Sequence, residues 1–454
     1  MRTPCVKAAG SGRSPGSGQT PAVHVASLRA PCHFPAMARQ ALGQAGRKAA
    51  PGEERYFRRG LGLKKEIQPV LDFEYGSALV ALIRARDFEL RVNRLHLRLA
   101  KSFGFCYGVD RAVDYAYESR RKFPDRRIFL VGEIIHNPHV NRRLEEMEIE
   151  FLYPTEEGEF DFSSVTPEDV VIIPAFGVTL HDFETLRALN CILIDTTCGS
   201  VLNVWKRVES YAREGFTTVV HGKYWHEETR TTSSQVNKYD GAKFLIVRDM
   251  AQAQVVCSYI RGDGDREDFM ELFDPSRSPG FDPDRDLGRI GVANQTTMLA
   301  SESLSIAAQL GEAMSDRWGP EELPNRFRSF DTICSATQKR QDAVKEMMEV
   351  PPDLMIVIGG YNSSNTNQLA HLCSLHTKTY HVEDATCIDT VRGRITHKRI
   401  GGDEILTEDA WLPSGEVEIG LTAGASTPDS KLGEAVERII RGAGYDPSEV
   451  LGTA

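Results

Sequence analysis

Hydrophobic and polar positions alternate along this chain between two patterns. Short, continuous apolar runs are typical of strands that are buried on both faces of a parallel sheet: LRLAK (97–101), RIFLVG (127–132), VVIIPAF (170–176), CILIDT (191–196), TTVVHG (217–222), KFLIV (243–247), RIGVA (289–293), LMIVIGG (354–360), KTYHV (378–382) and EVEIGLT (416–422). Most of them are followed by a glycine or polar turn and then by helical spacing, which is clearest over 109–123, 201–215 and 301–318. Strands that alternate with helices predict an α/β fold.

Two long polar stretches interrupt this alternation. Residues 261–288 and 392–415 are rich in glycine, proline and charge, and they contain no convincing active-site motif. We expect both to be excursions over the surface.

The first 52 residues differ in composition from the rest. They contain seven Lys or Arg and no Asp or Glu, together with much Ala, Gly, Ser and Pro. They also lack an apolar run of signal-peptide length, so the composition indicates an organelle transit peptide, with a disordered basic tail as the alternative. Without these seven cations, 64 acidic residues stand against 47 basic ones, a net charge near −17.

Charge and hydropathy exclude two classes of function. A body this acidic is a poor non-specific binder of nucleic acid, because phosphate contacts need clustered cations. No run approaches the roughly 20 apolar residues of a membrane-spanning helix. With 41% hydrophobic and 26% charged residues, the chain is typical of a soluble globular protein of two or more domains.

Three of the nine cysteines share one local context. Cys106, Cys198 and Cys334 each follow a predicted strand and precede a predicted helix. Sites in open α/β sheets form at the carboxyl ends of strands, so we expect three similar modules to converge on one point. The alternative for any one of them is a small buried core residue.

The remaining cysteines lack this context. Cys387, in HVEDATCID, resembles IDTTC but is not followed by a clean helix, while the others lie in the basic N-terminal segment, a strand or helices: Cys5, Cys32, Cys191, Cys257 and Cys373. Three thiolates fit poorly with structural zinc, which takes a closed set of four ligands. They fit an iron–sulfur cluster with one iron open to a substrate.

Other strand ends carry groups that bind anions. Histidines, hydroxyls and amides at helix starts suit phosphate oxygens, and we expect them to hold a diphosphate; helix capping is the alternative role for the serines. The residues are His136, His226, Thr296, Thr297, Ser363, Ser364, Asn365 and Ser426. Glu228, in HEET, is the candidate for proton transfer, because burial beside an anion raises a carboxyl pKa toward neutrality.

Eight motifs, in this order, resemble the 4-hydroxy-3-methylbut-2-enyl diphosphate reductase family (the LytB/IspH proteins). They are GFCYGVDRAV, EIIHNPHVN, DTTCGSV, HEET, NQTTM, ICSATQKRQDAV, NSSNTNQL and TAGASTPD, and the resemblance covers about residues 54–454. The KYWHEET form, the lead-in FRRGLGLKK and the two insertions are similar to the plant and algal branch.

The resemblance implies a fold of three α/β modules, with small and mainly parallel sheets, arranged as a trefoil around a central iron–sulfur cluster. We expect a transit peptide over 1–52, a lead-in over 53–96, and modules over 97–197, 198–330 and 331–454, the last with a C-terminal helix and tail. It further implies a [4Fe-4S] cluster whose fourth iron is open to substrate, held by Cys106, Cys198 and Cys334.

The implied reaction is the reductive dehydroxylation of 4-hydroxy-3-methylbut-2-enyl diphosphate to isopentenyl and dimethylallyl diphosphate, the last step of the methylerythritol phosphate pathway. Glu228 would deliver protons, with Thr296 and His226 assisting. His136, His226, Ser363, Asn365 and Ser426 would hold the diphosphate, with Ser364 and Thr296 close by. The implied electron donor is ferredoxin in the chloroplast stroma; assembly as a homodimer is left open.

Two positions depart from the family pattern. Phe176 stands where bacterial members carry a histidine, and Gly199 replaces the proline usual after the second cysteine. Two other functions stay open from the sequence: an iron–sulfur hydro-lyase that acts on a phosphorylated substrate without reductant, and a non-enzymatic iron–sulfur sensor. The sensor gives no reason for HEET and the Ser/Asn clusters to accompany the cysteines.

Overall fold

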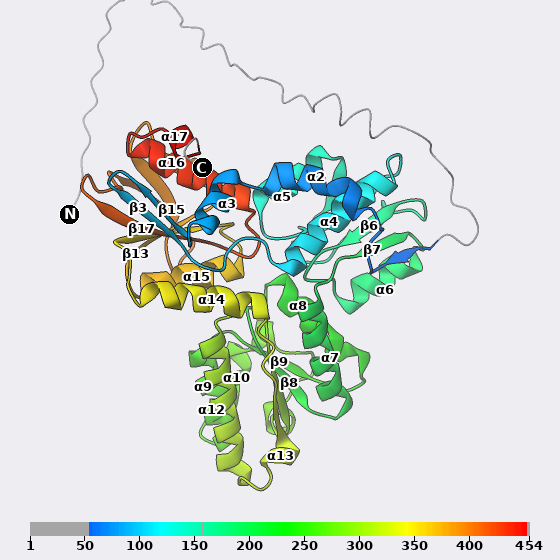
Figure 1. The fold of residues 1–454 in the computed structure, drawn as a ribbon. Helices are drawn as coiled ribbons and strands as arrows, with labels where there is room; N and C mark the ends of the chain where they lie inside the picture. The colour runs from blue at the N-terminus through cyan, green and yellow to red at the C-terminus, as the bar shows by residue number, and fades with distance from the viewer. Residues whose placement is uncertain (1–53, 157, 452–454) are drawn as a thin grey trace, which may run out of the picture. The chain divides into compact units, whose positions relative to one another are not determined.

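The computed structural model describes residues 54–156 and 158–451, and the transit peptide predicted over 1–52 lies outside them. The described residues form three sheets with helices packed against them (Figure 1). The first two sheets are entirely parallel, and the third combines parallel and antiparallel pairs. The expected fold class, α/β with mainly parallel sheets, is therefore confirmed. Among the described residues, no helix has the length and apolar character needed to span a membrane.

The first sheet has the strand order β1-β7-β6-β4-β5. Its central strands are buried along their whole length, as their apolar sequences predict. The strands are β1 (Tyr56–Phe57), β4 (Ile128–Val131), β5 (Ile149–Leu152), β6 (Val170–Ile173) and β7 (Ile192–Asp195). The helices that belong with it are α2 (Lys64–Tyr75), α4 (Tyr107–Lys122), α5 (Pro138–Glu146) and α6 (Leu180–Ala188).

The second sheet has the order β11-β10-β8-β9. The strands are β8 (Thr217–His221), β9 (Phe244–Val247), β10 (Ile290–Asn294) and β11 (Phe327–Ser329). The helices are α7 (Gly199–Arg213), α8 (Glu227–Ser234), α9 (Met250–Arg261), α10 (Arg266–Leu272), α11 (Pro283–Asp286), α12 (Ala300–Trp318) and α13 (Leu323–Arg326), with 3-10 turns η1 (Gln235–Lys238) and η2 (Asp274–Ser276).

The insertion at 261–288 is more than a surface excursion. It forms α10 and α11, and its aromatic residues Phe269, Phe273 and Phe281 are buried in the same core as β9 and α12. The expectation from the sequence was wrong here because the three aromatic residues are widely spaced among charged ones, so no apolar run marks their burial.

The third sheet has the order β14-β15-β13-β12-β17-β3-β2, with β16 paired to β15. The strands are β2 (Glu89–Val92), β3 (Leu95–Leu99), β12 (Leu354–Ile358), β13 (Lys378–Val382), β14 (Ile388–Asp389), β15 (Arg394–Lys398), β16 (Ile405–Asp409) and β17 (Val417–Ala423). The helices are α3 (Ala78–Ala85), α14 (Ser335–Met348), α15 (Ser364–Ser374), α16 (Asp429–Gly442) and α17 (Pro447–Leu451), with the 3-10 turn η3 (Ala385–Cys387).

The second polar stretch, 392–415, is likewise part of a sheet. It contains the antiparallel hairpin β15–β16, and Trp411 just after it is 4% exposed and belongs to the core of the third sheet. The alternating exposure along β16 is that of an edge strand with one face in solvent.

The chain passes from one sheet to the next at each of the three cysteines singled out from the sequence. β3 pairs with β17 in the third sheet, yet α4, which follows Cys106, packs on the first. β7 lies in the first sheet, and α7, after Cys198, packs on the second. β11 lies in the second sheet, and α14, after Cys334, packs on the third. In Figure 1 the blue β3 accordingly lies beside the late strand β17.

The crossing at Cys106 corrects one boundary of the expected division of the chain. The boundary placed between residues 96 and 97 cuts the β2–β3 hairpin, in which Leu90 pairs with Leu97. The lead-in is also not a separate arm, because β1 pairs with β7 of the first sheet. The strand before Cys106 and the helix after it were assigned to one module, but they pack on different sheets. At Cys198 and Cys334 the expected boundaries already lie between the strand and the helix.

Candidate active site

Each of the three cysteines is the N-cap residue of a long helix. Cys106 precedes α4, Cys198 precedes α7 and Cys334 precedes α14, each with extended backbone. The partial positive charge of a helix N-terminus favours a thiolate. The seven cysteines within the described residues are free thiols, so these three are available as ligands.

Backbone hydrogen bonds fix where the three cysteines lie. The N–H of Cys106 donates to the carbonyl of Ala425 (3.2 Å) and that of Cys198 to Ala175 (2.8 Å). The N–H of Cys334 donates to the carbonyl of Thr296 (3.3 Å). Each acceptor lies in the loop that follows a central strand, β17, β6 or β10 respectively. The carboxyl ends of strands in all three sheets therefore face the cysteines.

Gly108 keeps the space between two of the thiols open. A Cβ atom built on Gly108 would lie 2.5 Å from Cys198 Sγ and 3.9 Å from Cys106 Sγ. Only a residue without a side chain fits between these sulfurs. Of the glycines around Cys106, Gly108 is therefore required for the close approach of the backbone to the sulfurs.

The electrostatics of the thiols combine burial with one buried cation. Burial raises the pKa of Cys106 and of Cys198, while the charge of Arg340 lowers that of Cys106. Arg340 is 4% exposed and donates to the carbonyl of Gly104 (2.5 Å). Sequence reasoning missed Arg340; the available signal was a cation six residues after Cys334 on the helix that Cys334 caps.

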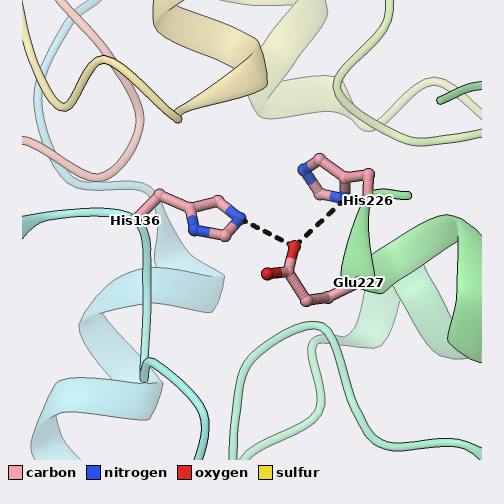
Figure 2. A group of neighbouring side chains, drawn as sticks. All are labelled: His136, His226 and Glu227. Atoms are coloured by element: carbon pink, nitrogen blue, oxygen red, sulfur yellow. Dashed lines mark ion pairs between the residues drawn. The ribbon is translucent and has the colours of Figure 1, made fainter. Parts of the chain in front are cut away.

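A second group consists of His226 and Glu227 at the start of α8 and His136 from the loop between β4 and α5 (Figure 2). Glu227 Oε2 is 3.5 Å from His136 Nε2 and 3.9 Å from His226 Nδ1. The two imidazole rings meet edge to face, with centroids 5.2 Å apart. Two histidines and a carboxylate could hold either a metal ion or an anion, and the ring hydrogen bonds distinguish between these.

The hydrogen bonds favour an anion. His226 caps α8 and accepts the N–H of Glu228 at Nδ1 (3.1 Å), so the proton of the neutral ring is on Nε2. His136 pairs through Nδ1 with Glu133 (2.9 Å), which is the donor side of that ring. Burial lowers the pKa of His136, but the Glu133 and Glu227 carboxylates outweigh it and the net shift is upward. The free Nε2 of His226 therefore carries a proton, and the two carboxylates favour the protonated form of His136, so the pair suits an anion better than a cation.

Glu228 lies one residue further along α8, in a different environment. Its side chain is 3% exposed, and its carboxyl oxygens accept the backbone N–H (2.6 Å) and hydroxyl (3.0 Å) of Thr296. Burial raises the pKa of Glu228 to about 7, although the bonds from Thr296 oppose that shift. A carboxyl with this pKa can hold and release a proton near neutral pH.

The third sheet supplies hydroxyl and amide groups at the start of α15. Ser363 is the N-cap and accepts the N–H of Thr366, while Asn365 Oδ1 accepts the N–H of Ala425 (2.9 Å). Ser426 donates its hydroxyl to the carbonyl of His136 (3.1 Å), which joins this group to the histidine pair. Ser363, Ser364, Asn365 and Ser426 are all buried.

Several polar atoms of this region are buried without a hydrogen-bond partner. They are His136 Nε2, His226 Nε2, Ser364 Oγ and Asn365 Nδ2. His136 Nε2 has only the 3.5 Å ion pair with Glu227, whose geometry is not that of a hydrogen bond. Unpaired buried donors are costly, and an anionic ligand would satisfy them. All four residues were among the candidates for diphosphate binding from the sequence.

Not every candidate joins the site. Thr297 accepts from the side chain of Gln295 (2.8 Å), while the hydrogen bonds to Glu228 come from Thr296. Phe176 stacks on His136 with ring centroids 5.1 Å apart. It therefore packs against the histidine and adds no polar group to the site. Cys387 lies in η3, where its sulfur is 3.6 Å from the Tyr361 hydroxyl and packs against the third sheet's core.

The family model of LytB protein matches residues 97–440. The chain belongs to the LytB family. A relative from Synechococcus sp. (strain CC9605), named 4-hydroxy-3-methylbut-2-enyl diphosphate reductase, is 46% identical over 389 residues, 86% of this chain and 96% of that one. A protein of the same name from Nostoc sp. (strain PCC 7120 / SAG 25.82 / UTEX 2576) is 46% identical over 388 residues, 85% of this chain and 94% of that one.

A solved structure supports the LytB fold. The E-1-hydroxy-2-methyl-but-2-enyl-4-diphosphate reductase from Plasmodium falciparum matches 76% of this chain and 87% of its own, with a TM-score of 0.56 and 21% identity. At this identity the match concerns the fold alone. The LytB family model covers this chain from Cys106 through to Ser426, so the family resemblance suggested by the eight motifs is confirmed.

Proposed function

We propose that this chain catalyses the reductive dehydroxylation of 4-hydroxy-3-methylbut-2-enyl diphosphate to isopentenyl and dimethylallyl diphosphate. The substrate hydroxyl is replaced by hydrogen, with two electrons and two protons consumed and one water released. The activity named for the curated relatives supports this proposal. In the structure, one residue carries it: Thr296 donates to Glu228 and accepts from the N–H of Cys334, so it joins the proton donor to the thiols.

Cys106, Cys198 and Cys334 would hold a [4Fe-4S] cluster. Three free thiols at helix N-termini, a glycine in place of a side chain between two sulfurs and a buried arginine suit an iron–sulfur group with three ligands. When bound, such a cluster supplies electrons one at a time and an open iron for the hydroxyl.

The other residues of the site would bind the diphosphate and move protons. His136, His226, Ser363, Asn365 and Ser426 would hold the anion, with Ser364 beside them, in the region of unpaired buried donors. Glu228 would deliver the proton from a buried carboxyl that Thr296 positions. A clamp at the diphosphate fixes the hydrocarbon end, which lowers the entropic part of the barrier.

Ferredoxin as electron donor and a plastid location complete the proposal. The basic composition of 1–52 and the cyanobacterial relatives support a plastid protein. Expression of residues 1–60 fused to a fluorescent protein tests the location: we expect import into plastids, and a cytosolic signal would contradict it.

One anaerobic assay tests the proposed reaction. The chain, reconstituted with iron and sulfide, is mixed with the hydroxylated diphosphate and reduced viologen dye, and the products are identified by mass spectrometry. We expect both diphosphate products only with reductant. Turnover without reductant would instead indicate a hydro-lyase, and no turnover at all would favour a sensor.

Two variants assign the roles. Glu228→Gln should retain the cluster's visible absorption and diphosphate binding but lose about a hundred-fold or more in turnover. Cys106→Ser should lose the visible absorption. Wild-type turnover in the first variant, or an unchanged spectrum in the second, would contradict the assignment of that residue.

A further inference from the structure

We propose that Glu227 is an internal anion, which occupies the diphosphate site when no ligand is bound and must be displaced before an anion can bind. The inference rests on the proposed function, since it takes the ligand to be a diphosphate. Glu227 lies in the first turn of α8 with its carboxylate between the two imidazole rings (Figure 2). Sequence reasoning passed over it because HEET offers two adjacent acids and Glu228 was taken as the functional one.

The carboxylate and a diphosphate compete for the same charge. His136 has Glu133 on Nδ1, so the side that a ligand can reach is Nε2, and Glu227 is 3.5 Å from it. The titratable groups that face His136 are Glu133 from its own loop and, from the start of α8, His226, Glu227 and Glu228. Glu133 is also held by Asn362 (3.2 Å), and Glu228 is held by Thr296. Neither is as free to leave as Glu227, whose side chain is 47% exposed.

The structure offers the displaced carboxylate a place to go. A cavity of about 270 Å³ lies beside the site, and its lining includes Glu133, Phe176, Glu227 and Arg230. Arg230 is three residues after Glu227 on α8, a spacing at which side chains on a helix are neighbours. Its guanidinium donates to the carbonyl of Gly158 (2.6 Å), which holds it at this cavity. Glu227 can therefore exchange His136 for Arg230 by a side-chain rotation.

This exchange adds the same cost to the binding of every anion. A diphosphate that contacts both histidines and the serine cluster can outweigh that cost, whereas a weakly held anion such as orthophosphate cannot. Glu227 would thus keep the site free of abundant anions and hold His136 in its protonated form until substrate arrives.

Calorimetric titration of the cluster-loaded chain with inorganic diphosphate tests the proposal. At about pH 6 we expect Glu227→Gln to bind diphosphate about five- to ten-fold more tightly than the wild type, because a competing charge has been removed. The matched control is Glu267→Gln, which removes an exposed first-turn glutamate from α10, away from the site, and should leave the Kd unchanged.

Dependence on pH and a second substitution separate displacement from a general loss of negative charge. Without Glu227 the pKa of His136 falls, so the gain in affinity should shrink as the pH is raised from about 6 to 8. Arg230→Gln should weaken diphosphate binding about three-fold when Glu227 is present. It should have no effect in the Glu227→Gln background, because only the Glu227 carboxylate needs Arg230 as an alternative partner.

The outcomes distinguish this proposal from the proposed function. If the wild type binds diphosphate and Glu227→Gln binds it equally or more weakly, Glu227 is not an internal anion, while the proposed diphosphate site is unaffected. A gain that does not change with pH, or an effect of Arg230→Gln that is equal in both backgrounds, also overturns the internal anion. If neither form binds diphosphate, both proposals fail, while binding by Glu227→Gln alone supports displacement.

Discussion

At the scale of single residues, two adjacent glutamates of α8 show how the backbone assigns chemistry. Successive residues on a helix point about 100° apart. Glu227 consequently reaches the histidines at the surface of the site, while Glu228 turns inward to Thr296 and is almost fully buried. The raised pKa of Glu228 agrees with the expectation from the sequence; its proton transfer stays a prediction.

Thr296→Val tests whether Glu228 is the proton donor. The Thr296 hydroxyl bonds to the carboxylate and lowers its pKa, so its removal should raise the pKa of Glu228 above about 7. A donor acts while protonated, and turnover should fall as the pH rises through that pKa. We expect the falling limb of the pH–rate profile to move up by about half to one pH unit in the variant.

Thr297→Val is the matched control for this substitution. The Thr297 hydroxyl bonds to Gln295, so its removal should leave the position of the limb unchanged. A lower rate in Thr296→Val without any shift of the limb would mean that the threonine acts on the substrate and not on Glu228.

At the scale of elements, the strand ends and helix starts were predictable from the sequence, but the residues of other sheets that pack against them were not. All ten predicted strands are present, because a continuous apolar run such as LMIVI marks burial directly in the sequence. The missed strands are short or lie toward sheet edges: β1 has two residues, and β16 alternates in exposure without an apolar face. The N-cap positions of the three cysteines also follow from local pattern. Arg340 and Gly108 do not, since their roles depend on neighbours brought in by other sheets.

Gly108→Ala should disturb the cysteine site without unfolding the chain. Alanine is the better helix former, yet its Cβ would lie 2.5 Å from Cys198 Sγ, and the sulfur must move. We expect an unchanged circular dichroism spectrum with iron content and visible absorption lowered by about half or more after anaerobic reconstitution.

Gly199→Ala provides the comparison within the same site. Gly199 directly follows Cys198 at the start of α7, and a Cβ there meets nothing within 4 Å. This variant should bind iron as the wild type does, because the added Cβ displaces no neighbour. Equal iron content in the two variants would show that the sulfur can move without consequence.

At the scale of the described chain, the lead-in ties two sheets together. Ile67, Leu71 and Tyr75 of α2 are buried in the core of the first sheet. Leu79, Val80 and Ile83 of α3, a few residues later, are buried in the core of the third sheet. Such sharing could not be predicted from the sequence, because an amphipathic helix shows that it has a buried face and not which sheet covers it. The same limit explains why the boundary between residues 96 and 97 was misplaced, since nothing local reveals that β3 pairs in the third sheet with β2 and β17.

A pair of valines tests whether the lead-in is an integral part of this core. Val80 is fully buried beside Ser77 and Gly433 of α16, whereas Val70 on α2 is 42% exposed. Val80→Asp places an unpaired charge in the third sheet's core and should lower the free energy of unfolding by more than about 3 kcal/mol. Val70→Asp should change it by about 0.5 kcal/mol or less.

Thermal unfolding should also release the iron. Cys106 lies between β3 of the third sheet and α4 of the first, so Val80→Asp should lose its iron absorption as it unfolds, at a lower temperature than Val70→Asp. If Val80→Asp unfolds at the wild-type temperature, or loses the lead-in while keeping its iron, the lead-in is a separable arm after all.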